Sequence, residues 1–424
     1  MERLVRIEQT RVEQTQEFGY TTRVTCRLCY SDRLLPIFSL GMQYISNFVK
    51  NKENKDKSAL KAPLELVLCE NCSLLQLRHT APQELLYSRF YWYHSGLTRT
   101  MRDALKEIAE TAARIVNLKK MMKKMKKKGI DGIVLDIGAN DGTLLSYYPK
   151  GAIRVGCEPA NNLIDELKRH CEYVIHDFWS YEAYKKLGIG KAKVITAIGM
   201  FYDMEDPNQF VADAAKALDT DGIFVAQLMC LKNMLEKNDV GNLCHEHLEY
   251  YSLESLKYLF EKNGLEIFKI EENEINGGSY RLYARHYRNG SVNFNEKFTS
   301  SDYKAFFSRF EENKMKCVKF IRDESAKGKK IYVYGASTKG NTILQYYGLN
   351  YHLIEGAADK SPEKWGRYTI GTWIPIMPEE EARKRADYFL VLPYAFLDEF
   401  IEREKEWMAK GGKFIVPLPE FRVL

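Results

Sequence analysis

The stretch Val134-Leu-Asp-Ile-Gly-Ala-Asn-Asp-Gly142 constrains the fold more than any other part of the chain. Its first residues are mostly apolar and suit a buried strand, Gly138 and Gly142 permit a sharp turn, and a helix-forming segment follows at 143–148. A strand, a glycine turn and a helix N-terminus together present bare backbone N–H groups to a ligand. A second apolar run then ends in Glu158, where a carboxylate suits the two hydroxyls of a ribose. These features predict a binding site for a molecule that contains adenosine.

The spacing of the glycines narrows the choice of cofactor. The pattern is Gly-x-x-x-Gly within Asp136-x-Gly-x-Asn-Asp-Gly142, which differs from the dinucleotide-binding pattern Gly-x-Gly-x-x-Gly. The loop resembles the S-adenosylmethionine (SAM) loop of class I methyltransferases, and the alternative is a strand, turn and helix of some other α/β protein. Farther on, Asp177 suits an adenine amino group and Phe178 suits packing on the ring. The cofactor-binding residues expected on this basis are Asp136, Gly138, Asn140, Asp141, Gly142, Glu158, Asp177, Phe178 and Met200.

Length and composition set outer limits. With 424 residues the chain is too long for one hydrophobic core, and 45% hydrophobic with 28% charged residues is typical of a globular protein. No apolar run reaches the roughly 18 residues of a membrane helix, and the N-terminus does not read as a secretion signal, so a cytoplasmic protein without a membrane partner is expected. The net charge is +6, much of it in the lysine run 119–128. Because that run is not interleaved with aromatic residues, a solvated helix end is favoured over nucleic-acid binding.

Strand and helix patterns alternate from residue 131 to about residue 285, which predicts a doubly wound, largely parallel sheet with helices on both faces. Ligands of such a sheet lie beyond the carboxyl ends of its strands. The expected strands are 133–137, 153–157, 173–176, 193–198, 222–228 and 280–285, and the expected helices are 97–128, 143–148, 161–169, 180–187, 207–218 and 252–263. A smaller α/β unit is expected from about residue 302, with helices at 303–327 and 342–347 and strands from 330 and at 353–357, 388–392 and 413–418.

Two Cys-x-x-Cys pairs precede the sheet. Residues 1–22 before them are polar and suggest a loose arm or a short strand. Each pair points two thiolates at one centre, and two pairs complete a tetrahedral zinc site with no open position, so a structural zinc is predicted. The gap between the pairs is longer than in a short zinc ribbon, and the alternative is a redox dithiol or two unrelated pairs. The predicted zinc ligands are Cys26, Cys29, Cys69 and Cys72.

The segment Cys244-His-Glu-His-Leu-Glu-Tyr-Tyr-Ser252 carries two histidines around a glutamate. His245 and His247 are two residues apart and would not share one face of a helix, so metal binding is not expected here. One histidine can instead act as a general acid or base with the carboxylate beside it. The alternative is a hydrogen-bonded structural histidine.

Two glycine-containing stretches suit an anionic ligand. Gly277 and Gly278 precede a strand and permit close approach of the backbone, and Arg281 could neutralise an anion. The stretch 330–341 is a strand, a turn of small residues and a helix, with hydroxyls and a lysine as in a phosphate cradle, although it is not a nucleotide-hydrolase P-loop. The alternative for this second unit is a purely structural α/β domain.

Together these blocks, from Cys26 to Arg422, resemble the sugar C-methyltransferases that act on nucleotide-linked keto-deoxysugars. The resemblance implies a zinc-binding module at 1–85, a SAM-dependent methyltransferase core at 86–300 and a C-terminal Rossmann-like domain at 301–424 that binds the nucleotide-linked sugar. It implies His247 as catalytic base with Glu246 beside it. In the aromatic segment 90–96 it implies a catalytic Tyr93, with Tyr91 as the second choice. The substrate-binding residues expected are Tyr91, Tyr202, Gly277, Gly278, Arg281, Ser337, Thr338, Lys339 and Lys360.

The chain departs from this family at three positions that face the sugar. Relatives that methylate carbon 3 have a tyrosine where this chain has Cys244, and an asparagine and a histidine where it has Ile198 and Tyr202. The sugar, its nucleotide or the methylated carbon can therefore differ. The predicted function is SAM-dependent C-methylation of a nucleotide-linked keto-deoxysugar by a monomer or small homo-oligomer. The alternatives are an O- or N-methyltransferase on a sugar, an NAD-linked sugar dehydrogenase, and a zinc-knuckle nucleic-acid-binding protein.

Overall fold

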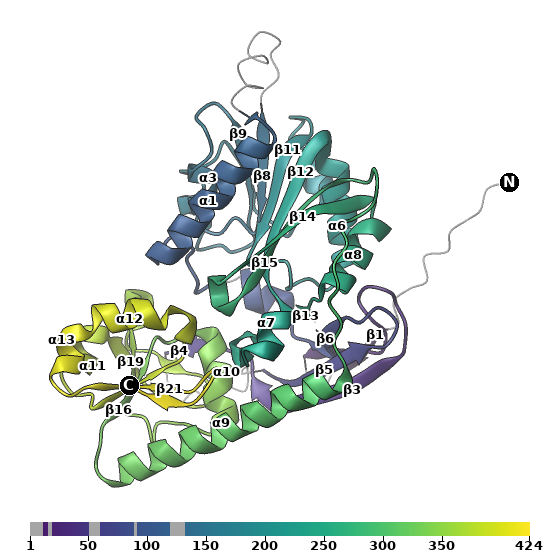
Figure 1. Cartoon of the computed structure of the whole chain (residues 1–424). Helices are drawn as coiled ribbons and strands as arrows, with labels where there is room; N and C mark the ends of the chain where they lie inside the picture. The colour runs from purple at the N-terminus through teal and green to yellow at the C-terminus, as the bar shows by residue number, and fades with distance from the viewer. Residues whose placement is uncertain (1–11, 16–18, 51–59, 89–90, 119–131) are drawn as a thin grey trace.

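The computed structural model describes residues 12–15, 19–50, 60–88, 91–118 and 132–424 (Figure 1). Within these residues no helix combines the length and the apolar character needed to cross a membrane. The lysine run 119–128 and most of the N-terminal arm lie outside the described residues.

The central domain is built on a seven-stranded sheet in the order β10-β9-β8-β11-β12-β15-β14. The first five strands are parallel, whereas β15 runs antiparallel to both of its neighbours. The strands are β8 (Ile133–Ile137), β9 (Ile153–Cys157), β10 (Tyr173–Ile175), β11 (Ala192–Ile198), β12 (Leu218–Met229), β14 (Leu265–Asn273) and β15 (Ser279–His286). The doubly wound sheet is thus confirmed, and β14 is a strand that the sequence pattern did not reveal.

Helices cover this sheet on both faces, as Figure 1 shows for α1 and α3 on one side and α6 and α8 on the other. Their ends follow ordinary capping: Asp206 accepts from the Gln209 N–H at 3.0 Å, with Pro207 in the first turn of α6. The helices are α1 (Arg99–Ile115), α3 (Thr143–Ser146), α4 (Ile164–Leu167), α5 (Tyr181–Lys185), α6 (Pro207–Ala217), α7 (Leu231–Glu236) and α8 (Leu253–Lys262). The described part of the helix predicted over 97–128 ends earlier, at Ile115, where a turn follows.

The N-terminal module consists of small antiparallel sheets, one of order β1-β2-β7 and one of order β13-β6-β5-β3. The edge strand β13 comes from the central part of the chain and pairs with β6, so the module and the core share a sheet. The elements are β1 (Val12–Thr15), β2 (Tyr20–Arg23), β3 (Leu34–Tyr44), β4 (Phe48–Val49), β5 (Lys61–Cys69), β6 (Leu75–Leu77), β7 (His79–Thr80), the π-helical turn Glu84–Ser88 and β13 (Glu249–Tyr250).

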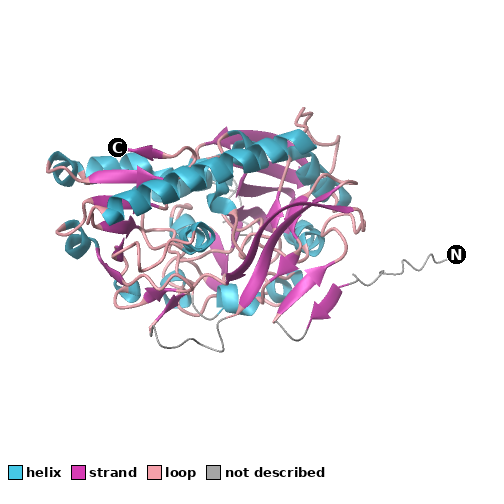
Figure 2. Cartoon of the chain, turned by 90° about the horizontal axis from the view of Figure 1, so that it is seen from below, coloured by secondary structure: helices cyan, strands magenta, loops and turns pink. Residues whose placement is uncertain are grey.

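The C-terminal domain has a six-stranded sheet in the order β19-β17-β16-β20-β21-β22, parallel except for the last strand. The long helix α9 leads into it along the underside of the molecule (Figures 1 and 2) and packs on β3, where the rings of Phe307 and Phe38 stack at 3.7 Å. The elements are α9 (Ser300–Ala326), β16 (Ile331–Tyr334), α10 (Thr338–Tyr347), β17 (Gly356–Asp359), β18 (Tyr368–Thr369), β19 (Ile376–Pro378), α11 (Glu379–Arg383), β20 (Tyr388–Val391), α12 (Leu397–Arg403), α13 (Lys405–Ala409), β21 (Lys413–Val416) and β22 (Arg422–Val423).

Two predicted boundaries in this domain were wrong. The strand expected at 353–357 begins only at Gly356, because a turn closes before it, with the Leu353 N–H donating to the Asn350 carbonyl at 2.9 Å. The helix expected at 342–347 begins at Thr338, because the Ser337 hydroxyl caps it by accepting from the Gly340 N–H at 2.9 Å.

Candidate functional site

A large cavity of about 690 Å³ lies beyond the carboxyl ends of the central parallel strands and is bounded on its other side by the C-terminal domain. Loops after β8, β9, β10 and β11 line one wall, and the turns after β16, β17 and β20 line the other. Fifteen of the residues predicted from the sequence line it: Tyr91, Tyr93, Gly138, Asn140, Glu158, Asp177, Phe178, Met200, Tyr202, Glu246, His247, Ser337, Thr338, Lys339 and Lys360.

The glycine loop after β8 forms the floor at one end of this cavity. Gly138 has φ +70°, and its N–H and that of Ala139 donate to the Cys157 carbonyl at 2.9 and 3.0 Å. A Cβ at Gly138 would lie 2.7 Å from Cγ of Met200, another cavity residue. A side chain at position 138 would therefore have no room, which agrees with a loop shaped for close approach of a ligand.

Glu158 and Asp136, the two acids of this predicted cofactor site, differ in exposure to it. The Glu158 carboxylate lines the cavity and accepts hydrogen bonds from the Asn140 and Ala160 N–H groups, each at 2.9 Å. These bonds lower the pKa of Glu158, but burial raises it by more. Asp136 lies behind the wall, accepts from the Thr196 hydroxyl at 2.6 Å, and has its pKa raised by burial to about 7. Asp136 thus supports the loop from below.

Asn140 and Asp141 use their side chains differently from what the sequence suggested. Asn140 accepts from the Ser95 N–H at 2.9 Å and donates to the Tyr93 carbonyl at 3.0 Å, while Asp141 accepts from the Gly96 N–H at 2.7 Å. The two side chains therefore clamp the aromatic segment onto the glycine loop. Asp141 does not line the cavity.

Gly142 also lies behind the wall. It has φ +79°, and a Cβ there would meet the His170 side chain at 2.9 Å. Gly142 is therefore required by the left-handed backbone of the turn and by the close packing of His170, and not by contact with a ligand.

Asp177 and Phe178, in the loop after β10, also line the cavity. The Asp177 carboxylate accepts from the Phe178 N–H at 2.7 Å, and the Phe178 side chain is 39% exposed while lining the cavity. An exposed ring at a cavity edge is available for stacking on a flat ligand.

His247 lies deep in the cavity and is buried. Its Nδ1 lies 2.8 Å from the Asn242 carbonyl oxygen, which can only accept, so Nδ1 carries the proton and Nε2 of the neutral ring has a free lone pair. Burial first, and then the charge of Lys339, hold the pKa of His247 well below 6.5. The Tyr202 ring packs edge-on against it at 4.4 Å. The imidazole is therefore neutral, oriented and equipped to accept a proton.

Glu246 stands beside this imidazole. Its Oε2 accepts from the Thr338 hydroxyl at 3.2 Å, and burial raises its pKa. The ligating atoms of Cys244, Glu246 and His247 lie within 4.8 Å of one another, close enough to hold a metal ion. The sequence predicted no metal here, and it did so from the spacing of His245 and His247 alone. Lys339, whose charge acts on all three groups, opposes a cation at this position.

The N-terminus of α10 faces the cavity from the C-terminal domain. Ser337, Thr338 and Lys339 all line it, and the Lys339 ammonium contacts neutral atoms, Met229 Sδ at 3.4 Å and Asn242 Oδ1 at 3.5 Å. Lys364 is committed elsewhere, donating to the Ala336 carbonyl at 2.7 Å. A helix N-terminus with an uncommitted lysine suits an anionic group.

Three predicted substrate residues lie outside the cavity wall. Arg281, in β15, donates to Gln227 Oε1 at 2.9 Å and pairs with Glu107 of α1 at 3.0 Å, so its charge is already neutralised away from the cavity. Gly277 and Gly278 instead make room for neighbouring side chains, since a Cβ would lie 2.4 Å from Asp239 Oδ2 and 1.8 Å from Asn233 Nδ2, respectively.

Several cavity residues had no place in the sequence prediction. Asp203 follows β11, and its Oδ1 is buried without a hydrogen-bond partner among the described residues. Asp203 could have been predicted from the sequence because it follows the carboxyl end of a parallel strand, where ligands of such a sheet bind. Asp239 accepts from the Tyr394 hydroxyl, which joins the two domains across the cavity, and no local pattern indicated that contact.

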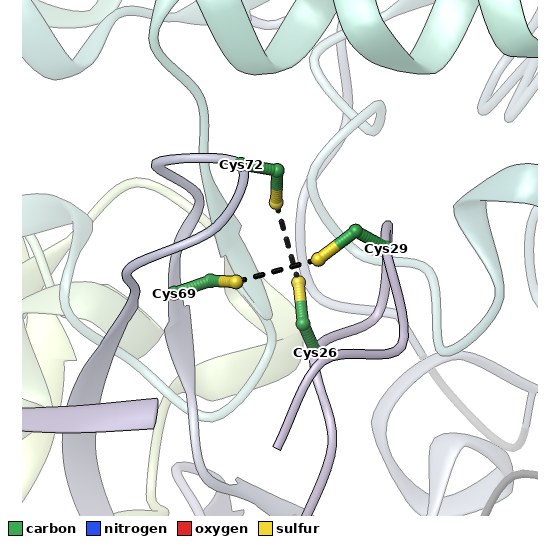
Figure 3. Close-up of side chains that lie close together, drawn as sticks. All are labelled: Cys26, Cys29, Cys69 and Cys72. Carbon is green, nitrogen blue, oxygen red and sulfur yellow. Dashed lines mark hydrogen bonds between the residues drawn. The ribbon is translucent and has the colours of Figure 1, made fainter. Parts of the chain in front are cut away.

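The four predicted zinc ligands converge on one point, as Figure 3 shows. The sulfur atoms of Cys26 and Cys72 lie 3.5 Å apart, those of Cys29 and Cys69 lie 3.4 Å apart, and all four lie within 4.8 Å of one another. Tetrahedral zinc with bonds of about 2.3 Å needs sulfur atoms about 3.8 Å apart, so the set fits the ion. None of the four lines the cavity, which fits a structural site.

Comparison with known proteins agrees with this architecture. Three family models match in order: a zinc binding domain over 26–87, a methyltransferase domain over 93–270 and a C-methyltransferase C-terminal domain over 274–419. The C-methyltransferase NovU of Streptomyces niveus is 27% identical over 416 residues, covering 94% of this chain and 96% of NovU.

Solved structures resemble parts of the chain at low similarity. Magnesium protoporphyrin IX methyltransferase from Synechocystis PCC 6803 with bound SAM matches 43% of this chain and 84% of its own, at 13% identity and a TM-score of 0.28. The glycopeptide N-methyltransferase MtfA with SAM matches 47% and 97%, at 11% identity and a TM-score of 0.33. Neither value carries weight, whereas the three models together span nearly the whole sequence. The chain therefore belongs to the SAM-dependent C-methyltransferases that combine a zinc-binding module, a methyltransferase core and the family's C-terminal domain.

Proposed function

We propose that this enzyme transfers the methyl group of SAM to a carbon atom beside the ketone of a nucleotide-linked keto-deoxysugar. One observation carries the proposal: the same cavity is lined by the glycine loop, by the N-terminus of α10 with Lys339, and by the neutral imidazole of His247. The glycine loop suits SAM, and the helix N-terminus suits a diphosphate. The family resemblance of the whole chain supports a sugar between them.

The chain's residues supply a base and donors for this reaction. Bound SAM supplies an electrophilic methyl group. His247 Nε2 takes the proton from the sugar carbon, and the C–H electron pair becomes an enolate. The enolate carbon bonds to the methyl group as the methyl–sulfur bond breaks, leaving S-adenosylhomocysteine, and His247 then returns its proton to solvent. Glu246 holds sugar hydroxyls or orients the imidazole.

A tyrosine hydroxyl is the natural donor to the enolate oxygen, because such a donor stabilises charge that develops in the transition state. Tyr91 suits this role better than Tyr93. Burial and the charge of Glu246 raise the pKa of Tyr91 well above 10, whereas burial and then the charge of Asp141 raise the pKa of Tyr93. Tyr91 and Glu246 both line the cavity, and the Tyr91 hydroxyl remains a proton donor at neutral pH.

Mass spectrometry tests the proposal directly. The purified protein is incubated with SAM and a panel of nucleotide-linked keto-deoxysugars, and a gain of one methyl group is scored. NMR of the product then identifies the methylated atom. Methylation of no panel member, or a methyl group on oxygen or nitrogen, would contradict the proposal.

Lys339→Met should raise KM for the nucleotide-linked sugar about tenfold or more, because a charge-assisted bond to phosphate is worth roughly 1.5–3 kcal/mol. KM for SAM should stay unchanged. Lys330→Met is the control, since Lys330 is exposed and pairs with Glu355 at 2.6 Å at the start of β16. Equal KM values for the sugar in both variants would exclude Lys339 from substrate binding.

The pH profile of kcat/KM should lack an inflection from the base near the ordinary histidine value. Because burial lowers the pKa of His247, the ring stays neutral when the pH falls through 6.5, and its acid limb lies below that value. Because the pKa of His247 is lower in the folded protein than in the unfolded chain, the free energy of unfolding should decrease as the pH falls below 6.5. In that range the unfolded chain binds a proton at this histidine and the folded protein does not. Initial rates between about pH 5 and 8 check this. An acid limb at or above pH 6.5 that disappears in His247→Asn would show the pKa direction to be wrong.

A further inference from the structure

Arg27 is an unusual residue within the zinc-binding module. It stands between Cys26 and Cys29 in the first zinc turn, yet its side chain is 0% exposed. A fully buried charge costs several kcal/mol to desolvate, and an apolar side chain in its place is often at least as stable. We therefore infer the role of Arg27 from the groups that its guanidinium contacts.

The guanidinium binds residues on both sides of the border between the module and the core. Within the module, Nη1 donates to the Leu77 carbonyl at 2.5 Å and Nη2 to the Thr80 hydroxyl at 2.7 Å. Toward the core, Nη2 donates to Glu205 Oε2 at 3.3 Å. Nε and Glu249 Oε1 form an ion pair at 3.6 Å, and neither atom has a hydrogen bond among the described residues. Glu205 lines the cavity, and Glu249 is fully buried.

Glu249 lies two residues after His247, and the backbone after His247 is hydrogen-bonded to β6 of the module and to the loop after β11. Strand β13 places Glu249 opposite Gln76 of β6, four residues after the zinc ligand Cys72. The Leu77 N–H donates to the Leu248 carbonyl at 2.9 Å. The Leu248 and Glu249 N–H groups donate to the Tyr202 carbonyl at 2.7 and 3.1 Å. Tyr202 in turn packs its ring on His247.

We propose that Arg27 is a positioning residue for methyl transfer: the zinc turn fixes its guanidinium, which fixes Glu249 and Glu205 and thereby the segment 244–249 that carries His247. The four-cysteine site then acts on the reaction from outside the cavity, through one buried side chain. This inference rests on the proposed role of His247 as the base.

The test compares Arg27→Met, Glu249→Gln and the double variant as full-length, zinc-loaded proteins. Each single change should lower kcat about tenfold or more, since a misplacement of about 1 Å can cost a hundredfold, while KM for SAM and the zinc content stay as in the wild type. The double variant should lose no more than the worse single variant, because removing one partner leaves the other buried and unpaired. Arg33→Met is the control, because Arg33 belongs to the same module but pairs with Glu70 at the surface, with side chains 63% and 46% exposed.

A second readout is independent of activity. In protein labelled with ¹⁵N-histidine, the His247 ring signals, assigned through His247→Asn, should shift in Arg27→Met and Glu249→Gln but not in Arg33→Met. Wild-type kcat together with unmoved His247 signals in Glu249→Gln overturns the inference, even if Arg27→Met fails to fold. If His247→Asn remains active while the ring signals still shift, the base assignment fails and the coupling stands.

Discussion

His247→Asn should lower kcat by about a hundredfold to ten-thousandfold, which is the usual contribution of a positioned general base. The asparagine amide keeps a donor near Nδ1 for the Asn242 carbonyl but removes the Nε2 lone pair, which the proposed mechanism requires as the proton acceptor. Initial rates at saturating SAM and sugar measure the loss. Because the imidazole is not expected to touch SAM, the dissociation constant of SAM should stay within about twofold.

The control for this variant is His352→Asn, at an exposed position in the turn before β17. It should keep the wild-type rate. A wild-type rate in His247→Asn would instead remove His247 from the mechanism and leave Glu246 or Asp203, both in the cavity wall, as the candidate bases.

Cys72→Ser should abolish stoichiometric zinc and lower the melting temperature of the whole chain by about 10 °C or more. A structural zinc contributes about 10–16 kcal/mol in isolated zinc peptides, which is comparable to the roughly 5–15 kcal/mol that stabilises a typical domain. The loss should reach the core because β6, which follows Cys72, pairs with β13 of the core. Metal analysis and scanning calorimetry measure both effects.

Cys171→Ser is the matched control, since its half-buried thiol contacts the Leu167 carbonyl at 3.3 Å and belongs to no zinc site. It should keep its zinc and shift the melting temperature little. A zinc-free Cys72→Ser protein with the wild-type transition would show that the cysteine cluster does not stabilise the fold.

Local patterns in the sequence were sufficient for the glycine loop and the zinc ligands. A positive φ at Gly138 and two close thiol pairs are properties of a few adjacent residues, so the chain could be interpreted there without knowing its neighbours. The parallel strands of the core were equally visible as buried apolar runs. Strand β14 was not predicted because four of its nine residues are charged and it lies at the edge of the sheet.

Roles that depend on distant contacts could not be predicted in this way. Asn140 and Asp141 are part of the expected loop, but their side chains bind backbone groups 45 residues earlier in the chain. Arg281 was predicted to bind an anion, but its charge is paired with Glu107 of α1, a contact that only the fold creates. No sequence pattern indicated a role for Arg27, because only the fold brings Glu205 and Glu249 to it.

The most direct measurement is a crystal structure of the enzyme with S-adenosylhomocysteine and the nucleotide-linked keto-deoxysugar that the panel identifies. We predict the sugar carbon beside the ketone about 3–3.5 Å from Nε2 of His247, with the diphosphate at the N-terminus of α10. A sugar ring bound away from the imidazole, or an Nε2 atom that faces the protein interior in the complex, would contradict the proposed reaction.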